Sequence, residues 1–176
     1  MIDPLAQRIS PWSSSQLSLG RKALDVLMPH FEPMLLDTYR RALGVDWDKL
    51  PDDVVQNEKF KLGRIAVGNF DQDYFERQRA VIKNVAGIAN YFDCVLAYHV
   101  YASNLIGTLM ERGKFKDSAE RSQAIEAILK SVFTDMAVVV TFYVLRGSHR
   151  TGDLGRARTA GGAVPEPGAA GVFADA

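Results

Sequence analysis

The stretch DYFERQRAVIKNVAGIANYF, residues 73–92, carries the pattern on which the fold depends. Its apolar residues recur mostly at i, i+3 and i+4, which is the spacing of one face of an α-helix. These residues are Tyr74, Phe75, Val81, Ile82, Val85 and Ile88. Charged residues occupy the positions between them, so the stretch predicts an amphipathic helix with one face in a hydrophobic core.

Helical spacing also precedes and follows this stretch. The predicted helices cover about residues 15–28, 33–43, 52–67, 73–92, 94–111 and 118–146. Pro29 interrupts the first, Pro33 suits the first turn of the second, and Gly44 is a suitable stop. Asp52 or Asp53 is expected to cap the third helix. Almost nothing alternates as a strand does, and the predicted fold class is therefore all-α.

The character of the sequence changes at both ends of this helical region. Residues 1–15 mix proline, serine and polar residues without a period, and we expect a flexible lead-in. Residues 16–146 form the predicted domain. Residues 147–176 are rich in Gly, Ala and Pro and lack the apolar surface needed to offset ordering, which predicts a disordered tail or linker.

Composition limits the classes of function. The chain of 176 residues has a net charge of zero, which argues against electrostatic binding to nucleic acid. It has one cysteine, Cys94, so no intramolecular disulfide is possible. The start of the chain lacks the apolar segment of a signal peptide. The longest apolar run, residues 137–145, is far shorter than the roughly 20 residues of a membrane span. We expect a cytoplasmic protein without a membrane span.

The last two predicted helices are apolar on more than one side. In the last helix one apolar stripe comprises Ile125, Ile128, Leu129, Val132, Met136, Val139 and Tyr143, and a second comprises Phe133, Ala137, Val140 and Val144. Two such helices from each of two chains would form an antiparallel four-helix bundle, whereas a monomer would bury the pair internally. We predict the homodimer, with an interface formed by Val95, His99, Ala102, Ile106, Val132, Met136, Val139 and Tyr143.

Candidates for catalysis are few. The sequence has no phosphate-binding Gly-rich loop, no cysteine pair for zinc and no HExxH motif, and we expect no enzymatic activity and no metal site. Three histidines, His30, His99 and His149, are far apart. His99 lies in an apolar helix and is either a core or interface residue or a ligand or pH sensor, because imidazole titrates near neutral pH. Tyr39 is either a core residue or points its hydroxyl into a ligand pocket.

Four stretches resemble the globin domain of bacterial globin-coupled sensors. They are PHFEPMLLDTYRRAL, LGRIAVGNFDQDYFERQRAVIKNVAGIA, YFDCVLAYHVYASNLI and FTDMAVVVTFYVL, in the order and spacing typical of the family. The likeness covers about residues 18–146. It implies a globin-like helical sandwich in which the last two long helices form the dimeric four-helix bundle. It also implies a signalling input domain, of the kind found on chemoreceptors and cyclases.

The chain departs from the family at the haem ligand. The position eleven residues after Tyr74, where the resemblance implies a histidine, holds Val85, which has no lone pair for iron. His99 lies on the next helix and is the alternative ligand. Tyr39 matches the tyrosine that lies near bound gas in haem-bearing members. We therefore expect no cofactor at this position, with haem as the alternative.

Two functions follow from the resemblance. The first is a haem-free, globin-like sensory input domain that dimerises and relays a signal to an output domain or partner protein, such as a chemoreceptor in chemotaxis. Its stimulus would be a proton, sensed by His99, a small molecule or a partner. The alternative is a haem-binding oxygen or gas sensor with an unusual axial ligand.

Overall fold

The structure is a computed structural model that describes the backbone of residues 4–85 and 91–159 and the side chains of residues 4–83 and 91–145. Every regular element in these ranges is a helix, so the all-α prediction is confirmed. The elements are η1 (Ala6–Arg8), α1 (Ser14–Leu27), η2 (Met28–His30), α2 (Phe31–Leu43), α3 (Asp52–Ile65), α4 (Gln72–Val85), α5 (Tyr91–Arg112) and α6 (Ser118–Thr159).

Local sequence explains where most of these helices begin and end. Ser13 and Gln16 form a reciprocal capping box at the start of α1. Pro29 confines η2 to a single turn between α1 and α2. Gly44 ends α2 with a φ of 64°, a left-handed conformation that glycine adopts without strain. At α3 the expected aspartate cap is wrong, because Pro51 occupies that position and the aspartates lie in the first turn.

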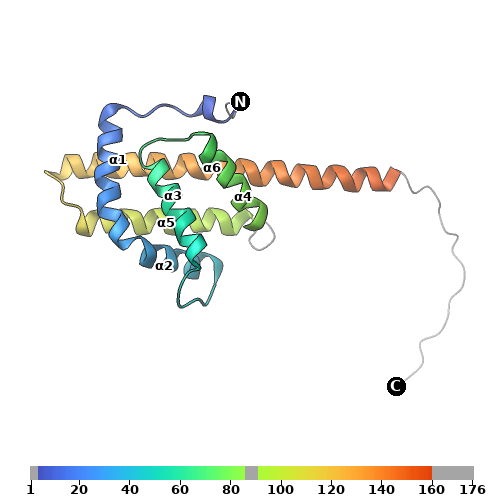
Figure 1. Cartoon of the computed structure of the whole chain (residues 1–176), viewed down its shortest axis with the longest axis horizontal. Coiled ribbons are helices and arrows are strands. Elements are labelled where there is room, and N and C mark those ends of the chain that lie inside the picture. Colours follow the sequence, from blue (N-terminus) through green and yellow to red (C-terminus); the bar gives the residue numbers. More distant parts are fainter. Residues whose placement is uncertain (1–3, 86–90, 160–176) are drawn as a thin grey trace, which may run out of the picture. The chain divides into compact units, whose positions relative to one another are not determined.

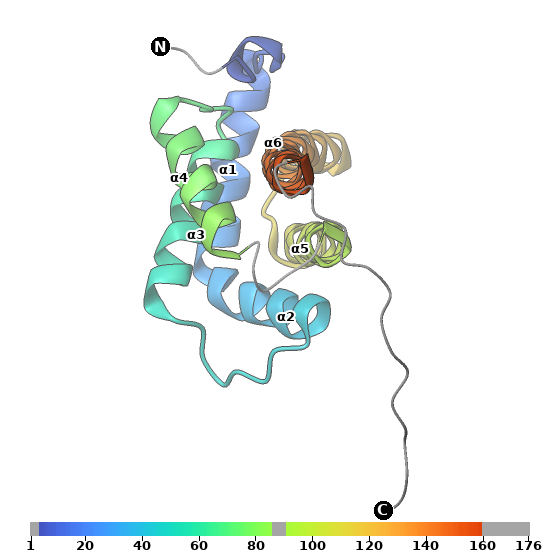
Figure 2. The same cartoon turned by 90° about the vertical axis from the view of Figure 1, so that its right-hand side faces the viewer.

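The helices of residues 4–143 pack around one hydrophobic core. Helices α5 and α6 lie side by side, while α1 and α3 cross them steeply (Figures 1 and 2). Helix α2 packs against α5, where the Asn104 amide donates hydrogen bonds to the Met34 carbonyl and to Asp37. All six α-helices contribute to the largest fully buried apolar side chains, which are Leu27, Phe31, Leu35, Leu62, Ile65, Tyr74, Phe75, Leu105, Leu109, Ile128 and Val132.

The N-terminal region is tied to the core more closely than the sequence predicts. Trp12 is buried, packs against the Phe70 ring and lies under the ammonium of Lys130. Gly68 makes this contact possible, because a Cβ at that position would overlap the Trp12 ring. The predicted flexible lead-in therefore does not extend to residue 15, since an apolar anchor and a helix cap fix its last residues.

Helix α6 continues beyond its predicted end. It runs to Thr159 rather than to about Arg146, so part of the predicted tail is helical, whereas residues 160–176 lie outside the described residues. Within the described side chains, the segment Ser118–Leu145 is long and apolar enough to cross a membrane. The core helix of a soluble protein meets the same criterion, so the absence of a membrane span stays a prediction.

Part of the predicted dimer interface belongs to the core of the chain itself. Ala102, Val132 and Val139 are at most 9% exposed, so the prediction that these three face a second chain is wrong. They are buried because the other helices cover that side of α5 and α6. Large apolar side chains instead emerge elsewhere on these helices, with Phe92 70%, Met110 51% and Phe133 53% exposed.

Candidate functional site: a buried polar cavity

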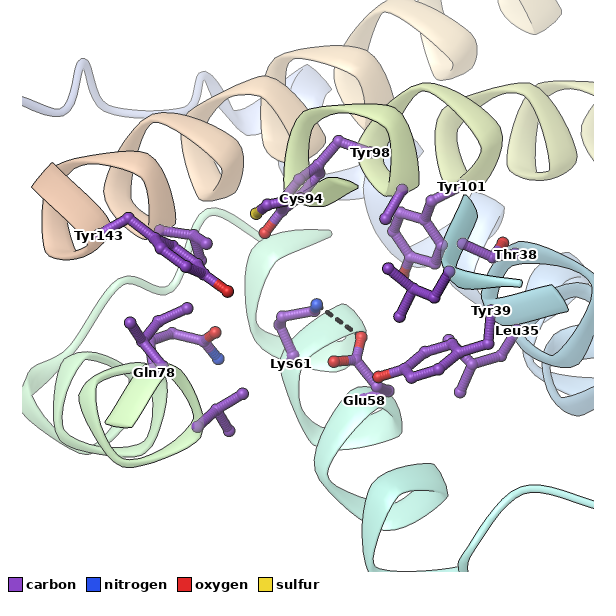
Figure 3. Close-up of a pocket in the computed structure, with 15 residues that line it drawn as sticks. Leu35, Thr38, Tyr39, Glu58, Lys61, Gln78, Cys94, Tyr98, Tyr101 and Tyr143 are labelled. Atoms are coloured by element: carbon purple, nitrogen blue, oxygen red, sulfur yellow. Dashed lines mark ion pairs between the residues drawn. The ribbon is translucent and has the colours of Figure 1, made fainter. Parts of the chain in front are cut away.

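A cavity of about 110 Å³ lies between α2, α3, α4, α5 and α6 (Figure 3). Its wall is apolar where α2, α4 and α5 meet, and polar where α3 faces the tyrosines of α2, α5 and α6. The lining residues are Leu35, Thr38, Tyr39, Leu43, Glu58, Lys61, Gln78, Val81, Ile82, Cys94, Ala97, Tyr98, Tyr101, Val139 and Tyr143. A space of this size resembles the cavities that hold a few waters or one benzene-sized molecule.

Asp135 of α6 anchors the polar side of this region. Its side chain is fully buried and accepts hydrogen bonds of 2.5 Å from the hydroxyls of Tyr74 on α4 and Tyr98 on α5. The ammonium of Lys61 on α3 lies 3.7 Å from the same carboxylate. Because a buried carboxylate needs such partners to remain charged, Asp135 connects three other helices to α6.

Lys61 and Glu58 form a buried ion pair beside this carboxylate. The Lys61 ammonium lies 2.5 Å from the Glu58 carboxylate, and both side chains are about one-tenth exposed (Figure 3). Burial alone would lower the pKa of Lys61, but the attraction of Glu58 and Asp135 outweighs it and raises the pKa above its ordinary value. The lysine therefore stays protonated, and its ammonium also lies near the faces of the Tyr98 and Tyr101 rings.

Two polar groups of the cavity wall have no hydrogen-bond partner among the described residues. They are the hydroxyl of Tyr101 and the side-chain nitrogen of Gln78, on residues that are 4% and 2% exposed. A buried polar group without a partner destabilises a fold by about 1–3 kcal/mol. Such groups in a cavity wall are the expected feature of a site that a polar molecule completes.

Tyr39 lines this cavity and also packs against the hydrophobic core, so both of its sequence-based interpretations stay open. Its ring stacks on Trp47, and its side chain lines the cavity beside Glu58 (Figure 3). Burial, followed by the nearby charge of Glu58, raises the pKa of Tyr39 above its ordinary range. The hydroxyl is therefore a neutral donor at physiological pH.

The residues of this cavity do not fit haem. Pockets for cofactors typically begin at about 300 Å³, and an ion pair occupies the polar wall here. Cys94 lines the cavity, but burial raises the pKa of its thiol to about 11, so it does not supply the thiolate that iron binds.

Neither of the two positions considered for a haem ligand appears in the described lining. His99 is exposed on α5 and is absent from the lining. Val85 is the last residue of α4, and its side chain lies outside the described residues. Among the described side chains, no group of three His, Cys, Asp or Glu residues is arranged to hold a metal ion.

The sequence reading missed most of this site. Glu58 and Lys61 are spaced as a surface ion pair on a helix, and nothing local marks them as buried. Asp135 did carry a signal, because it is a single carboxylate within the apolar run of the last helix. An isolated charge in such a run is expected to have a buried partner. Gln78 carried no comparable signal.

Comparison with known proteins gives no assignment. No family model matches the chain, and neither the curated proteins nor the solved structures contain a significant match. The resemblance to sensor globins therefore stays a prediction from the four sequence stretches.

Proposed function

We propose that this chain is a haem-free, globin-like sensory input domain that dimerises and relays a signal through α6. The stimulus acts in the buried polar cavity. The helices serve as a globin-like sandwich in which the space used for haem in other members is reduced to a small polar site. The output is a signalling domain or partner protein, such as a chemoreceptor.

The observation that carries this proposal is the position of Asp135. It lies on α6 and accepts hydrogen bonds from α4 and α5, while the Lys61 ammonium of α3 lies nearby. A change in the cavity that moves Lys61 or Tyr98 therefore acts on α6 directly. Helix α6 is helical to Thr159, and the shift of a helix is one of the known ways in which a signal is relayed.

The proposed dimer uses the uncovered faces of α5 and α6. We call the apolar face the surface formed by Phe92, Ile106, Met110, Phe133, Ala137 and Val140. Phe92, Met110, Phe133 and Ala137 are exposed, and Ile106 and Val140 are half-buried. Figure 2 shows the α5–α6 pair with no other helix packed on the side away from α1, α3 and α4. Exposed apolar side chains on two neighbouring helices favour association of two copies into a four-helix bundle.

Sedimentation equilibrium of the full chain tests the dimer. We expect a dimeric mass for the wild type and a monomeric mass for Phe133→Asp, which places a charge at an exposed position of the apolar face. Ala80→Asp is the matched control, because Ala80 is exposed on α4 and lies outside the apolar face. A monomeric wild type, or loss of the dimer in both variants, would contradict the proposal.

Hydrogen exchange of the full chain tests the relay. Asp135→Asn should change amide exchange along α6, including its part beyond Tyr143, because it weakens the contacts that hold α6 to three helices. Ser131→Ala is the control, since the buried Ser131 hydroxyl donates only within its own helix, to the Ala127 carbonyl. Equal exchange patterns in the two variants would show that Asp135 has no special connection to α6.

A further inference from the structure

The charges around the cavity do not balance. Lys61 contributes one positive charge, whereas Glu58 and Asp135 contribute two negative charges within 3.7 Å of its ammonium. Lys61 and Glu58 are the charged residues of the described lining, and Asp135 is bonded to the lining residue Tyr98. Among these three buried groups the negative charge therefore exceeds the positive charge by one. An excess of negative charge disfavours an anion and favours a cation.

The cavity wall is also rich in aromatic faces. Tyr39, Tyr98, Tyr101 and Tyr143 line it, and the Lys61 ammonium already lies 5.7 Å and 5.6 Å from the ring centres of Tyr98 and Tyr101. Tyrosine rings beside carboxylates are the combination that recognises organic ammonium groups. A simple inorganic cation would gain less from these rings, because they give it no oxygen ligands.

The unpartnered groups add a second requirement. The hydroxyl of Tyr101 and the amide nitrogen of Gln78 are donors without acceptors among the described residues. Figure 3 shows them on opposite sides of the Lys61–Glu58 pair. The Gln78 nitrogen is satisfied only by an acceptor atom, which an alkylammonium ion lacks, whereas the Tyr101 hydroxyl can donate to such an atom or accept from an ammonium. The volume of about 110 Å³ limits the ligand to a few non-hydrogen atoms.

We propose that the cavity binds a small amino alcohol, a monocation that also carries an oxygen acceptor. Its ammonium lies against the tyrosine rings and the excess carboxylate charge. Its oxygen accepts a hydrogen bond from Tyr101 or Gln78. The inference rests on the proposed function, because it names the class of ligand for the same cavity.

Calorimetric titration of the full chain with four small probes tests the ligand class. Ethanolamine carries both features, ethylamine lacks the oxygen, ethylene glycol lacks the charge and glycolate reverses it. We expect saturable binding of ethanolamine, binding of ethylamine that is about tenfold weaker for the lost hydrogen bond, and no binding of the other two. Absence of ethanolamine binding, or equal binding of glycolate, overturns the inference, and the cavity then holds water alone.

Two sets of variants locate the binding. Tyr101→Phe or Gln78→Leu should abolish the preference for ethanolamine over ethylamine, and a preference retained in both overturns the assignment of the donor. Glu58→Gln removes the net negative charge and should weaken ethanolamine binding at least tenfold. The double variant Glu58→Gln with Lys61→Gln restores the net charge and should recover binding. Urea unfolding of each variant identifies those that fold. Tyr101→Phe keeps the ring and is expected to fold, so the test can be read from it even if another variant does not.

Binding and hydrogen exchange measured on the same protein distinguish this inference from the proposed function. If ethanolamine binds but leaves the dimer and the hydrogen exchange of α6 unchanged, the ligand site stands and the sensory relay fails. If no probe binds while Asp135→Asn alters exchange beyond Tyr143, the relay stands and the ligand class is wrong.

Discussion

Tyr98 and Tyr101 offer a matched pair of substitutions that tests the description of the cavity. They lie three residues apart on α5, are 8% and 4% exposed, and have ring centres at nearly the same distance from the Lys61 ammonium. Replacing either by phenylalanine removes one hydroxyl and keeps the ring. The two hydroxyls differ in one respect: that of Tyr98 donates to Asp135, whereas that of Tyr101 has no described partner.

The expected changes in the free energy of unfolding have opposite signs. Tyr98→Phe removes a hydrogen bond to a charged group, which costs about 1.5–3 kcal/mol. Tyr101→Phe removes a buried donor whose unmet hydrogen bond costs about 1–3 kcal/mol, offset in part by the small void that the oxygen leaves. We therefore expect Tyr98→Phe to destabilise by about 2 kcal/mol and Tyr101→Phe to be neutral or stabilising by about 1 kcal/mol. The cation–π contribution cancels in the comparison because both rings remain.

Urea unfolding measures both changes, provided that the slope with denaturant is the same for the three proteins. A double-mutant cycle with Asp135→Asn adds a second test: Tyr98 should show a coupling energy to Asp135 and Tyr101 should show much less. If Tyr101→Phe destabilises as much as Tyr98→Phe, the Tyr101 hydroxyl has a partner in the folded protein. The argument for an unsatisfied cavity wall would then fail.

Three further predictions concern pH, backbone contact and haem. Burial and the charge of Asp135 raise the pKa of the tyrosines bonded to it. Their contribution to stability is complete below the unfolded tyrosine pKa of about 10 and falls by about 1.4 kcal/mol per pH unit per tyrosine above it. On titration to high pH, tyrosinate absorbance should therefore appear together with loss of helicity. Ionisation of these two tyrosines while the protein stays folded would contradict their described burial. Gly20→Ala should destabilise the fold by about 1–3 kcal/mol, because the new Cβ would overlap the Ala66 carbonyl. Gly63→Ala should stabilise it by about 0.5–1 kcal/mol, because the new Cβ meets open space within a helix. Urea unfolding of both variants measures the two changes. Haemin added to the full chain should give no absorption spectrum of axially ligated iron, and a ligated spectrum would show that the cavity opens far beyond its described volume.

The helices could be predicted because their causes are local. Apolar periodicity, the turn-forming residues and the helix stops act within a few positions, and the left-handed Gly44 is a clear case. The continuation of α6 beyond Arg146 was not predicted. The expected helix end was placed where the composition changes, and composition does not determine where a helix stops. The buried face of α5 and α6 was missed for a different reason. Two apolar stripes on one helix do not reveal which stripe the rest of the chain covers.

The polar cavity depends on tertiary contacts that the local sequence does not contain. Glu58 and Lys61 become buried only because α2, α4 and α5 surround that turn of α3, as the tyrosines around them show. The single charge in α6, Asp135, was the best available signal, and tracing its partners would have led to the rest of the cluster. A search of apolar helices for one isolated carboxylate is therefore more informative here than a search for motifs.

The proposed sensory role and a scaffold role make different predictions for the cluster of Lys61, Glu58 and Asp135. Replacing a buried ion pair by well-packed apolar side chains is often neutral or stabilising, so dimerisation alone does not require these charges. The cluster instead gives the interior a charge that a proton or a cation can change, at a point where α6 is held. Because the hydrogen bonds to Asp135 connect two other helices to α6, a change in that charge is expressed as a change in helix packing. A scaffold role predicts that an apolar triple replacement keeps both stability and output, whereas the sensory role predicts that it keeps stability and loses output.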